Sequence, residues 1–327
     1  MAHEISTVSG KAEVFAVGEM WHGLGAVVQE AQNSEEAARL SGTDWEVMTT
    51  DIQGVNGLVI PDRVANYRIA ADGSLVNLGV VSKDYKIIQP ADCWRGMDAI
   101  IGEGNAHYTS AGCLKDGRRV FIQAKLPGEF FIGKSDRVEK YLTLANGNDG
   151  GLAFRLYFTA TRVVCQNTLT ASLRDAASGI TLRHIGGDLS ERVQEAAEAL
   201  AAANEYFAAV AFNMQKLAEA KATQKEAEEF IASIYPDWHH MNGNEKVMHS
   251  RQGVRDDVMI GYATGPGQEE ACGTYWGLYN AVTWYEDHAK WEDSKVAVSR
   301  RVESMAFGPG ADRKQKAFSV ALDMAGI

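Results

Sequence analysis

The sequence predicts an α+β protein with mainly antiparallel sheets, a β-β-β-α core and a helical C-terminal region that contains a long heptad-patterned helix. Strand-like runs separated by Gly, Asn and Asp turns fill the first part, and strict apolar-polar alternation marks three strands in the middle. A helical period follows residue 188. We therefore place an α+β sheet domain at residues 1–187 and a helical region at residues 188–327, which packs on that domain or mediates self-association.

Composition narrows the class of protein. The chain has 327 residues, of which 46% are hydrophobic, so it can bury a large core. No run approaches the roughly 20 apolar residues that cross a bilayer, and the N-terminus lacks the basic and apolar regions of a signal peptide. The four cysteines form no Cys-x-x-Cys pair, which indicates reduced thiols. We expect a cytoplasmic protein that does not enter a membrane.

The first region mixes strands with two short helices. Runs at residues 44–52, 65–70 and 75–88 have strand composition, and we expect them to share one sheet with the strands of the middle region. One helix is predicted at 33–42, with Ser34 as its N-cap, and another follows Pro90.

The middle region alternates more regularly. Residues 117–127, 138–151 and 151–158 read as three strands, and the Asn-Gly and Asp-Gly pairs near residue 148 predict a hairpin between the last two. Thr159 then has the character of an N-cap for a helix at residues 160–176. The predicted local order is strand, strand, strand, helix.

The third region is mostly helical. From residue 189, apolar residues recur at heptad spacing, which is typical of a helix that pairs with another helix, with the sheet or with a second subunit. The positions of this seam are Val193, Ala196, Leu200, Ala203, Phe207, Val210, Met214 and Leu217. Thr223 and Glu226 predict a capping box for a helix that Pro236 ends. A helix at 274–293 precedes a basic tail at 299–318, which Gly and Pro interrupt.

Charge is unevenly distributed. The net charge of −11 argues against a protein coated in positive potential, as a duplex-DNA binder would be. Between Lys115 and Arg183, however, eleven Lys and Arg face only six Asp and Glu. A local basic surface is therefore expected within an acidic protein.

The alternation in the middle strands gathers cations and aromatic rings on one face. Cations that follow a phosphate backbone and rings that stack bases, at roughly 1–3 kcal/mol per base, are the combination that single-strand binders use. The competing interpretation is a solvated outer face whose cations balance acidic helices. The candidate nucleic-acid-binding residues are Arg118, Arg119, Phe121, Lys125, Arg155, Tyr157, Arg162, Asn167, Arg174, Arg183 and His184.

Other reactive residue types have simpler explanations. Cys165 and His184 could form a nucleophile and base, but no third orienting residue is evident, so we expect a structural cysteine. His239 and His240 lack the i, i+4 spacing that directs two imidazoles to one ion. We expect no catalytic residue, no metal site and no cofactor.

Six segments together resemble one family, in the right order along nearly the whole chain. They are MWHGLG at 20–25, LGVVSKDYKIIQP at 78–90, AGCLKDGRRVF at 111–121, TRVVCQNTL at 161–169, RH at 183–184 and YNAVTWYEDH at 279–288. They are similar to the phage/plasmid-like proteins of the DUF932 family. That resemblance implies residence in phages, plasmids and other mobile elements, and hence in a host cytoplasm, without implying a reaction.

Our leading hypothesis is a non-enzymatic protein that binds single-stranded DNA and anneals it as a homo-oligomer. The predicted β-β-β-α order resembles the core of phage and Rad52-type annealing proteins, which is an analogy of fold only. The alternative is a phage protein that binds and neutralises a host factor through its acidic surface. A third hypothesis is an enzyme with a pocket near Cys165 and His184.

Overall fold

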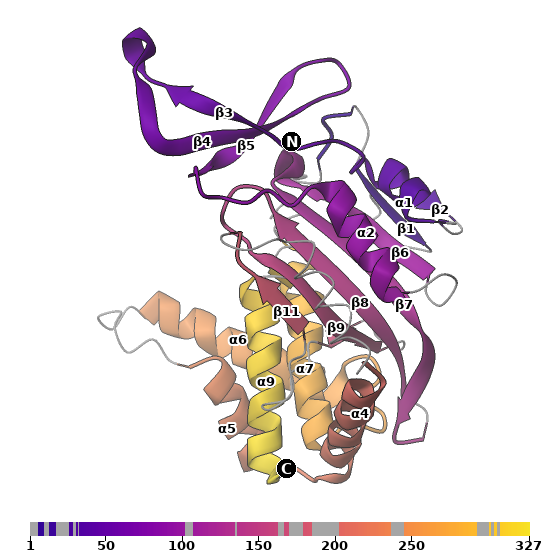
Figure 1. The fold of residues 1–327 in the computed structure, drawn as a ribbon. Helices are drawn as coiled ribbons and strands as arrows, with labels where there is room; N and C mark the ends of the chain where they lie inside the picture. Colours follow the sequence, from indigo (N-terminus) through magenta and orange to yellow (C-terminus); the bar gives the residue numbers. More distant parts are fainter. Residues whose placement is uncertain are drawn as a thin grey trace.

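A twisted main sheet of eight strands is the centre of the molecule (Figure 1). In this computed structural model the described residues are 6–9, 13–17, 26–28, 31, 33–101, 107–134, 136–162, 167–169, 179–184, 203–236, 245–292, 301, 304–305 and 308–327. The strand order is β10-β9-β8-β7-β6-β1-β2, with β11 also paired to β9. All pairings are antiparallel except β1 with β2. The strands are β1 (Val14–Val17), β2 (Ala26–Val28), β6 (His107–Leu114), β7 (Arg119–Ile132), β8 (Asp136–Gly147), β9 (Phe154–Arg162), β10 (Asn167–Leu169) and β11 (Gly179–Leu182).

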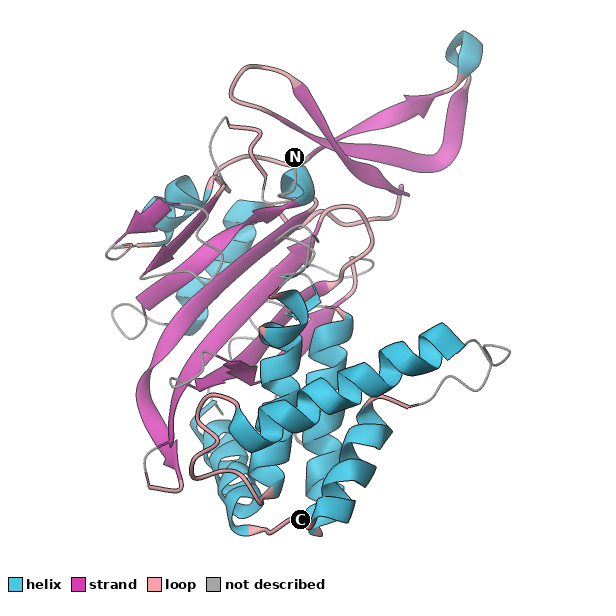
Figure 2. Cartoon of the chain, turned by 180° about the vertical axis from the view of Figure 1, so that it is seen from behind, coloured by secondary structure: helices cyan, strands magenta, loops and turns pink. Residues whose placement is uncertain are grey.

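A second sheet projects from one end of the main sheet, and we call it the arm. It consists of β3 (Met48–Gln53), β4 (Val59–Ile69) and β5 (Leu75–Ser82), in that order. The short 3-10 helix η1 (Val55–Gly57) forms its tip. Both views show the arm extending away from the rest of the chain (Figures 1 and 2). The expectation that all these strands share one sheet is therefore wrong for β3, β4 and β5, although β6 does join the middle strands.

The apolar face of the main sheet is covered by helices α1 (Ser34–Ser41) and α2 (Pro90–Ile101). Alternation along β7 buries Val120, Ile122 and Ala124 on this side, and the side chain of Trp94 on α2 joins the same core. α2 begins at Pro90, as predicted. The N-cap of α1 is Asn33 and not Ser34, because the Asn33 side chain accepts a hydrogen bond from the amide of Glu36.

The helix predicted at residues 160–176 is wrong where the structure describes the chain. β9 continues through Thr159 to Arg162, and Asn167–Leu169 form strand β10, which pairs with the end of β9. The reason is tertiary: residues 138–141 of β8 need a hydrogen-bonding neighbour, and β9 supplies it, with Thr161 opposite Glu139. The α+β class is confirmed, whereas the β-β-β-α order is not.

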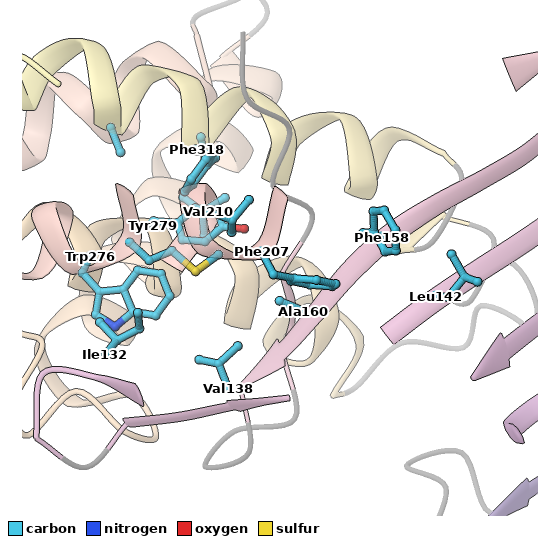
Figure 3. Close-up of a cluster of buried hydrophobic side chains, with 14 of the residues drawn as sticks. Ile132, Val138, Leu142, Phe158, Ala160, Phe207, Val210, Trp276, Tyr279 and Phe318 are labelled. Atoms are coloured by element: carbon cyan, nitrogen blue, oxygen red, sulfur yellow. The ribbon is translucent and has the colours of Figure 1, made fainter. Parts of the chain in front are cut away.

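Among the described residues, five helices form a bundle that contacts the main sheet through α4 at β7 and through α7 at β10. Five of the eight predicted seam positions, from Ala203 onward, lie in α4, where Phe207, Val210, Met214 and Leu217 are buried. The ring of Phe207 meets Phe158 of β9 edge-on at 5.1 Å, so this part of the seam packs within the chain (Figure 3). The seam positions before Ala203 lie outside the described residues. The helices are α4 (Ala203–Glu219), α5 (Gln224–Ile234), α6 (Glu245–Thr264), α7 (Tyr275–Asp287) and α9 (Pro309–Ala325).

Helix α5 begins with the predicted capping box, in which the side chains of Thr223 and Glu226 each bond the other's backbone amide. The predicted basic tail is wrong in part, because Pro309–Ala325 form a regular helix. Its residues Ala317, Phe318 and Ala321 are buried against α7 and α4. Proline is tolerated at the start of this helix because the first amides of a helix have no intrahelical partner.

Buried charges in the helical part are paired. Lys314 of α9 donates to Asp287 of α7 at 2.7 Å, and neither side chain reaches solvent. The neighbouring carboxylate of Glu286 accepts from Lys290 at 2.7 Å, from the hydroxyl of Tyr235 at 2.9 Å and from Arg313 at 3.3 Å. A buried charge without a partner is strongly destabilising, so these contacts fix α9 against α7.

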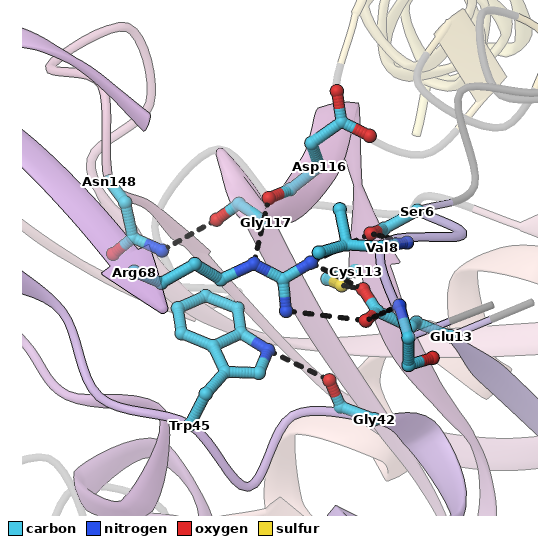
Figure 4. A network of polar contacts seen from close by, with 11 residues as sticks. Ser6, Val8, Glu13, Gly42, Trp45, Arg68, Cys113, Asp116, Gly117 and Asn148 are labelled. Atoms are coloured by element: carbon cyan, nitrogen blue, oxygen red, sulfur yellow. Dashed lines mark hydrogen bonds and ion pairs between the residues drawn. The ribbon is translucent and has the colours of Figure 1, made fainter. Parts of the chain in front are cut away.

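A buried ion pair joins the arm to the main sheet (Figure 4). Arg68 of β4 donates to both carboxylate oxygens of Glu13, at 2.6 and 3.3 Å, and stacks 4.5 Å from the centre of the Trp45 ring. Its Nε donates to the carbonyl of Asp116 in the β6–β7 turn. The thiol of Cys113 also donates to Glu13, whose charge, together with burial of the thiol, raises the pKa of Cys113.

Replacement of Arg68 tests this joint. Arg68→Ala is expected to lower the free energy of unfolding by about 3–5 kcal/mol, because it leaves the Glu13 carboxylate buried without its counter-ion. Urea unfolding followed by tryptophan fluorescence measures the change. Arg63→Ala, at an exposed arginine of the same strand, serves as the control and should stay within about 0.5 kcal/mol of the wild type. Equal losses in the two variants would contradict the assignment.

Candidate nucleic-acid interface

The second face of the main sheet, which we call the polar face, carries the predicted binding residues Arg119, Phe121 and Lys125 of β7 and Arg155 and Tyr157 of β9. The register places Phe121, Ala145, Arg155 and Thr181 in one row across β7, β8, β9 and β11. The next row contains Gln123, Thr143 and Tyr157. Residues directly opposite each other in an antiparallel pair share a face. β7 and β9 are thus brought to one surface, as predicted, with β8 between them (Figure 2).

Two predicted cations of this face are neutralised by carboxylates. Arg119 is buried and forms an ion pair with Asp149, and Lys125 donates to Glu139 at 2.6 Å. Arg137 bonds Glu139 at 3.1 Å and Glu129 at 2.5 Å. Burial opposes ionisation of Glu139, but the hydrogen bonds from Lys125 and Tyr141 prevail and lower its pKa. Arg119 and Lys125 therefore do not offer free charges, which the strand alternation alone does not reveal.

Three other predicted cations are exposed. Arg118, Arg155 and Arg183 have no ion-pair or hydrogen-bond partner for their side chains within the described part of the chain. Lys86, which the sequence interpretation missed, is also exposed, and its amide donates to the carbonyl of His184 at 2.7 Å.

These four exposed cations, which we call the cationic end, gather where β11 and β7 approach the arm. Arg183 lies two residues beyond Thr181, whose backbone pairs with Arg155. The carbonyl of Arg118 accepts from the amide of Asn148 at 2.9 Å, in the loop that follows β8. No single stretch of sequence marks this cluster, because its members come from four segments.

His184 occupies the interior side of the cationic end. Its ring stacks on Tyr85, with centroids 4.5 Å apart and planes 13° apart, and its Nδ1 lies 2.9 Å from the carbonyl of Lys86. This contact identifies Nδ1 as the protonated nitrogen of the neutral ring. Burial of the ring lowers its pKa. His184 is therefore a neutral packing residue beside the cations and not a phosphate ligand, contrary to its predicted role.

The aromatic rings of the polar face are only partly accessible. Phe121 and Tyr157 are half-buried, and burial raises the pKa of the Tyr157 phenol. Next to Tyr157 on this face, the side-chain hydroxyls of Thr143 and Thr159 lie 3.2 Å apart. Phe121 stands in the same row as Arg155, so a half-buried ring and an exposed cation share one row of this face, with Ala145 of β8 between them.

Several predicted residues cannot be placed at side-chain level. Arg162 and Asn167 are paired through their backbones at the β9–β10 contact, and the structure describes nothing of their side chains. Arg174 lies outside the described residues, as do Cys165, His239 and His240. The thiol-base and imidazole hypotheses therefore remain predictions.

A hollow lies at the far end of the β7–β8 hairpin. It is bordered by Asp136, Glu269 and Glu270, and the indole of Trp276 donates to Asp136 at 2.9 Å. Three carboxylates disfavour a phosphate there. In the described part of the chain, no cluster of three or more His, Cys, Asp and Glu residues could hold a metal ion, and no helix is long and apolar enough to span a membrane.

The depressed pKa of His184 predicts a specific acid sensitivity. The unfolded chain binds a proton at this residue near its ordinary pKa of 6.5, whereas the folded chain does not, so stability is lost as the pH falls through that value. His184→Phe keeps a ring on Tyr85 and removes the titration. Urea unfolding on either side of pH 6.5 should show a smaller acid-induced loss in His184→Phe than in the wild type, and identical losses would argue against a buried neutral imidazole.

Comparison with known proteins gives one result. No curated protein and no solved structure matches the chain. The sequence profile of DUF932, a domain of unknown function, matches residues 77–315, from within β5 to within α9. The matched part includes the polar face, helix α2 and the helices from α4 to α7, but not α1. Because the match covers most of the chain, the protein belongs to the DUF932 family.

Proposed function

We propose that the protein binds single-stranded nucleic acid across the polar face, with the cationic end as its phosphate-binding part. The observation that carries this proposal is the position of four exposed cations, Lys86, Arg118, Arg155 and Arg183, at one end of a sheet whose polar face has aromatic rings. Exposed guanidinium groups suit phosphate oxygens, and sheet faces with rings suit unstacked bases. Arg155 and Phe121 in one row supply both kinds of contact.

The charge distribution limits where a nucleic-acid strand can bind on the protein. With a net charge of −11, the protein repels nucleic acid over most of its surface, so binding depends on the few exposed cations at one site. Such a site favours a flexible single strand, which bends to reach scattered contacts, over a rigid duplex. Annealing of two strands further requires more than one copy of the protein, and we include that activity in the proposal.

Binding depends on Arg155 and Arg183 in a measurable way. For a labelled oligothymidylate, the double variant Arg155→Ala/Arg183→Ala should lower the slope of log affinity against log salt by about 1.4, since each phosphate contact to a single strand contributes roughly 0.7. Fluorescence anisotropy over a salt series measures both slope and affinity.

The matched control removes two exposed charges elsewhere. Arg95→Ala/Lys225→Ala eliminates cations of α2 and α5, away from the polar face, and should leave the slope unchanged. An equal fall in both double variants would mean a nonspecific charge effect. If the wild type does not bind the oligonucleotide at low salt, the proposed function is wrong. The alternative is then a protein that binds a host factor through its acidic surface, which a pull-down from host lysate tests.

Glu139 restrains Lys125, which could otherwise join the site. Glu139→Gln should release Lys125, whereas Arg137 keeps its bond to Glu129, and should increase affinity with a salt slope steeper by about 0.7 if Lys125 contacts one phosphate. The same anisotropy titration measures the gain. Glu228→Gln, an exposed carboxylate on α5, controls for the change in net charge. An equal gain in affinity in both variants would mean that the nucleic acid does not bind at the polar face.

A further inference from the structure

The arm has one face that packs on the body of the protein and one that does not. Asn66, Arg68, Leu78 and Val81 are buried on the inner side, through contacts that include the Arg68–Glu13 pair. The opposite side, which we call the outer face, is formed by three register rows: Thr50–Ala65–Val80, Met48–Tyr67–Asn77 and Ile69–Leu75. Every outer-face residue is exposed or half-buried.

The outer face and the adjoining tip hold most of the exposed large apolar side chains. On the outer face Ile69 is 49% exposed, Leu75 71% and Val80 54%, and at the tip Val55 is 86% exposed and Leu58 72%. Seven of the eleven large apolar side chains that are exposed in the described residues lie between Val55 and Val80. An apolar surface concentrated in this way marks an interaction site.

The same surface carries no charge. None of the eight residues of the outer face is ionisable at neutral pH, and neither is any residue of the tip from Gly54 to Pro61. Arg63, on the row next to Thr50, ends the uncharged region. In a chain of net charge −11, two copies repel each other over most of their surfaces, whereas two outer faces meet without repulsion.

We infer that the outer face of the arm binds the outer face of a second copy of this chain. A twofold axis places the same residues opposite each other, so an uncharged apolar sheet face is its own complement. A stable interface uses about 20 residues from each partner, which is more than the eight outer-face residues, so the tip contributes as well. The described part of the heptad seam cannot form the contact between two copies, because its residues Phe207, Val210, Met214 and Leu217 are buried within the chain.

Light scattering coupled to size-exclusion chromatography tests this interface without nucleic acid, so its result is independent of the proposed binding function. The full-length wild type is expected to have twice the monomer mass of 35.6 kDa. Thr50→Lys and Val80→Lys each place a charge in the outer face and should return the mass to that of the monomer.

Adjacent threonines of β3 provide the matched control. Thr49→Lys adds the same charge at an exposed position whose register partner, Asn66, belongs to the inner side, and the dimer should persist. Circular dichroism spectra of all variants should match the wild type, since Thr49, Thr50 and Val80 are exposed and their replacement leaves each subunit folded. A monomeric wild type at every concentration would overturn the inference, as would a dimer that survives Thr50→Lys and Val80→Lys. A monomeric wild type that floats with neutral phosphatidylcholine vesicles would assign the outer face to lipid instead.

Discussion

Burial of one face of the main sheet is the interaction on which the rest of the structure depends. Helix α2 covers this face from the N-terminal half, while Phe207 of α4 reaches it from the C-terminal half. A fully buried Leu or Phe side chain contributes about 1.5–3 kcal/mol, so residues such as Leu142 and Phe158 hold together segments that are distant in sequence. Because helices occupy the apolar face, the polar face is the side of the sheet on which the exposed cations can meet a ligand.

Buried ion pairs add a second constraint, because they determine where the arm and α9 lie more than they stabilise the fold. Arg68 and Glu13 are 55 residues apart, and Lys314 and Asp287 are 27 apart, yet each pair is almost removed from solvent. Replacing such a pair with apolar residues is often neutral, whereas breaking it is costly. The pairs therefore select one position for the arm and one for α9 among the many that apolar packing alone would allow.

The elements best predicted from the sequence are those that local chemistry determines. Alternation identified β7, β8 and β9, and Thr223 with Glu226 identified the start of α5. Thr159 misled because the same residue suits an N-cap and a strand, and only the unpaired edge of β8 decides between them. At the candidate site, alternation placed Arg119 and Arg155 on one face correctly. It could not show that Asp149, 30 residues away, neutralises Arg119 while Arg155 stays exposed.

Gly79 of β5 lies directly against Asp149, and a Cβ atom at this position would come within 2.8 Å of the Asp149 backbone. Asp149 is also the ion-pair partner of Arg119, at the edge of the polar face. The arm thus rests on the residue that holds a cation of the sheet in place. A side chain at position 79 would therefore displace Asp149 from Arg119, so the fit between the arm and the sheet requires a glycine here.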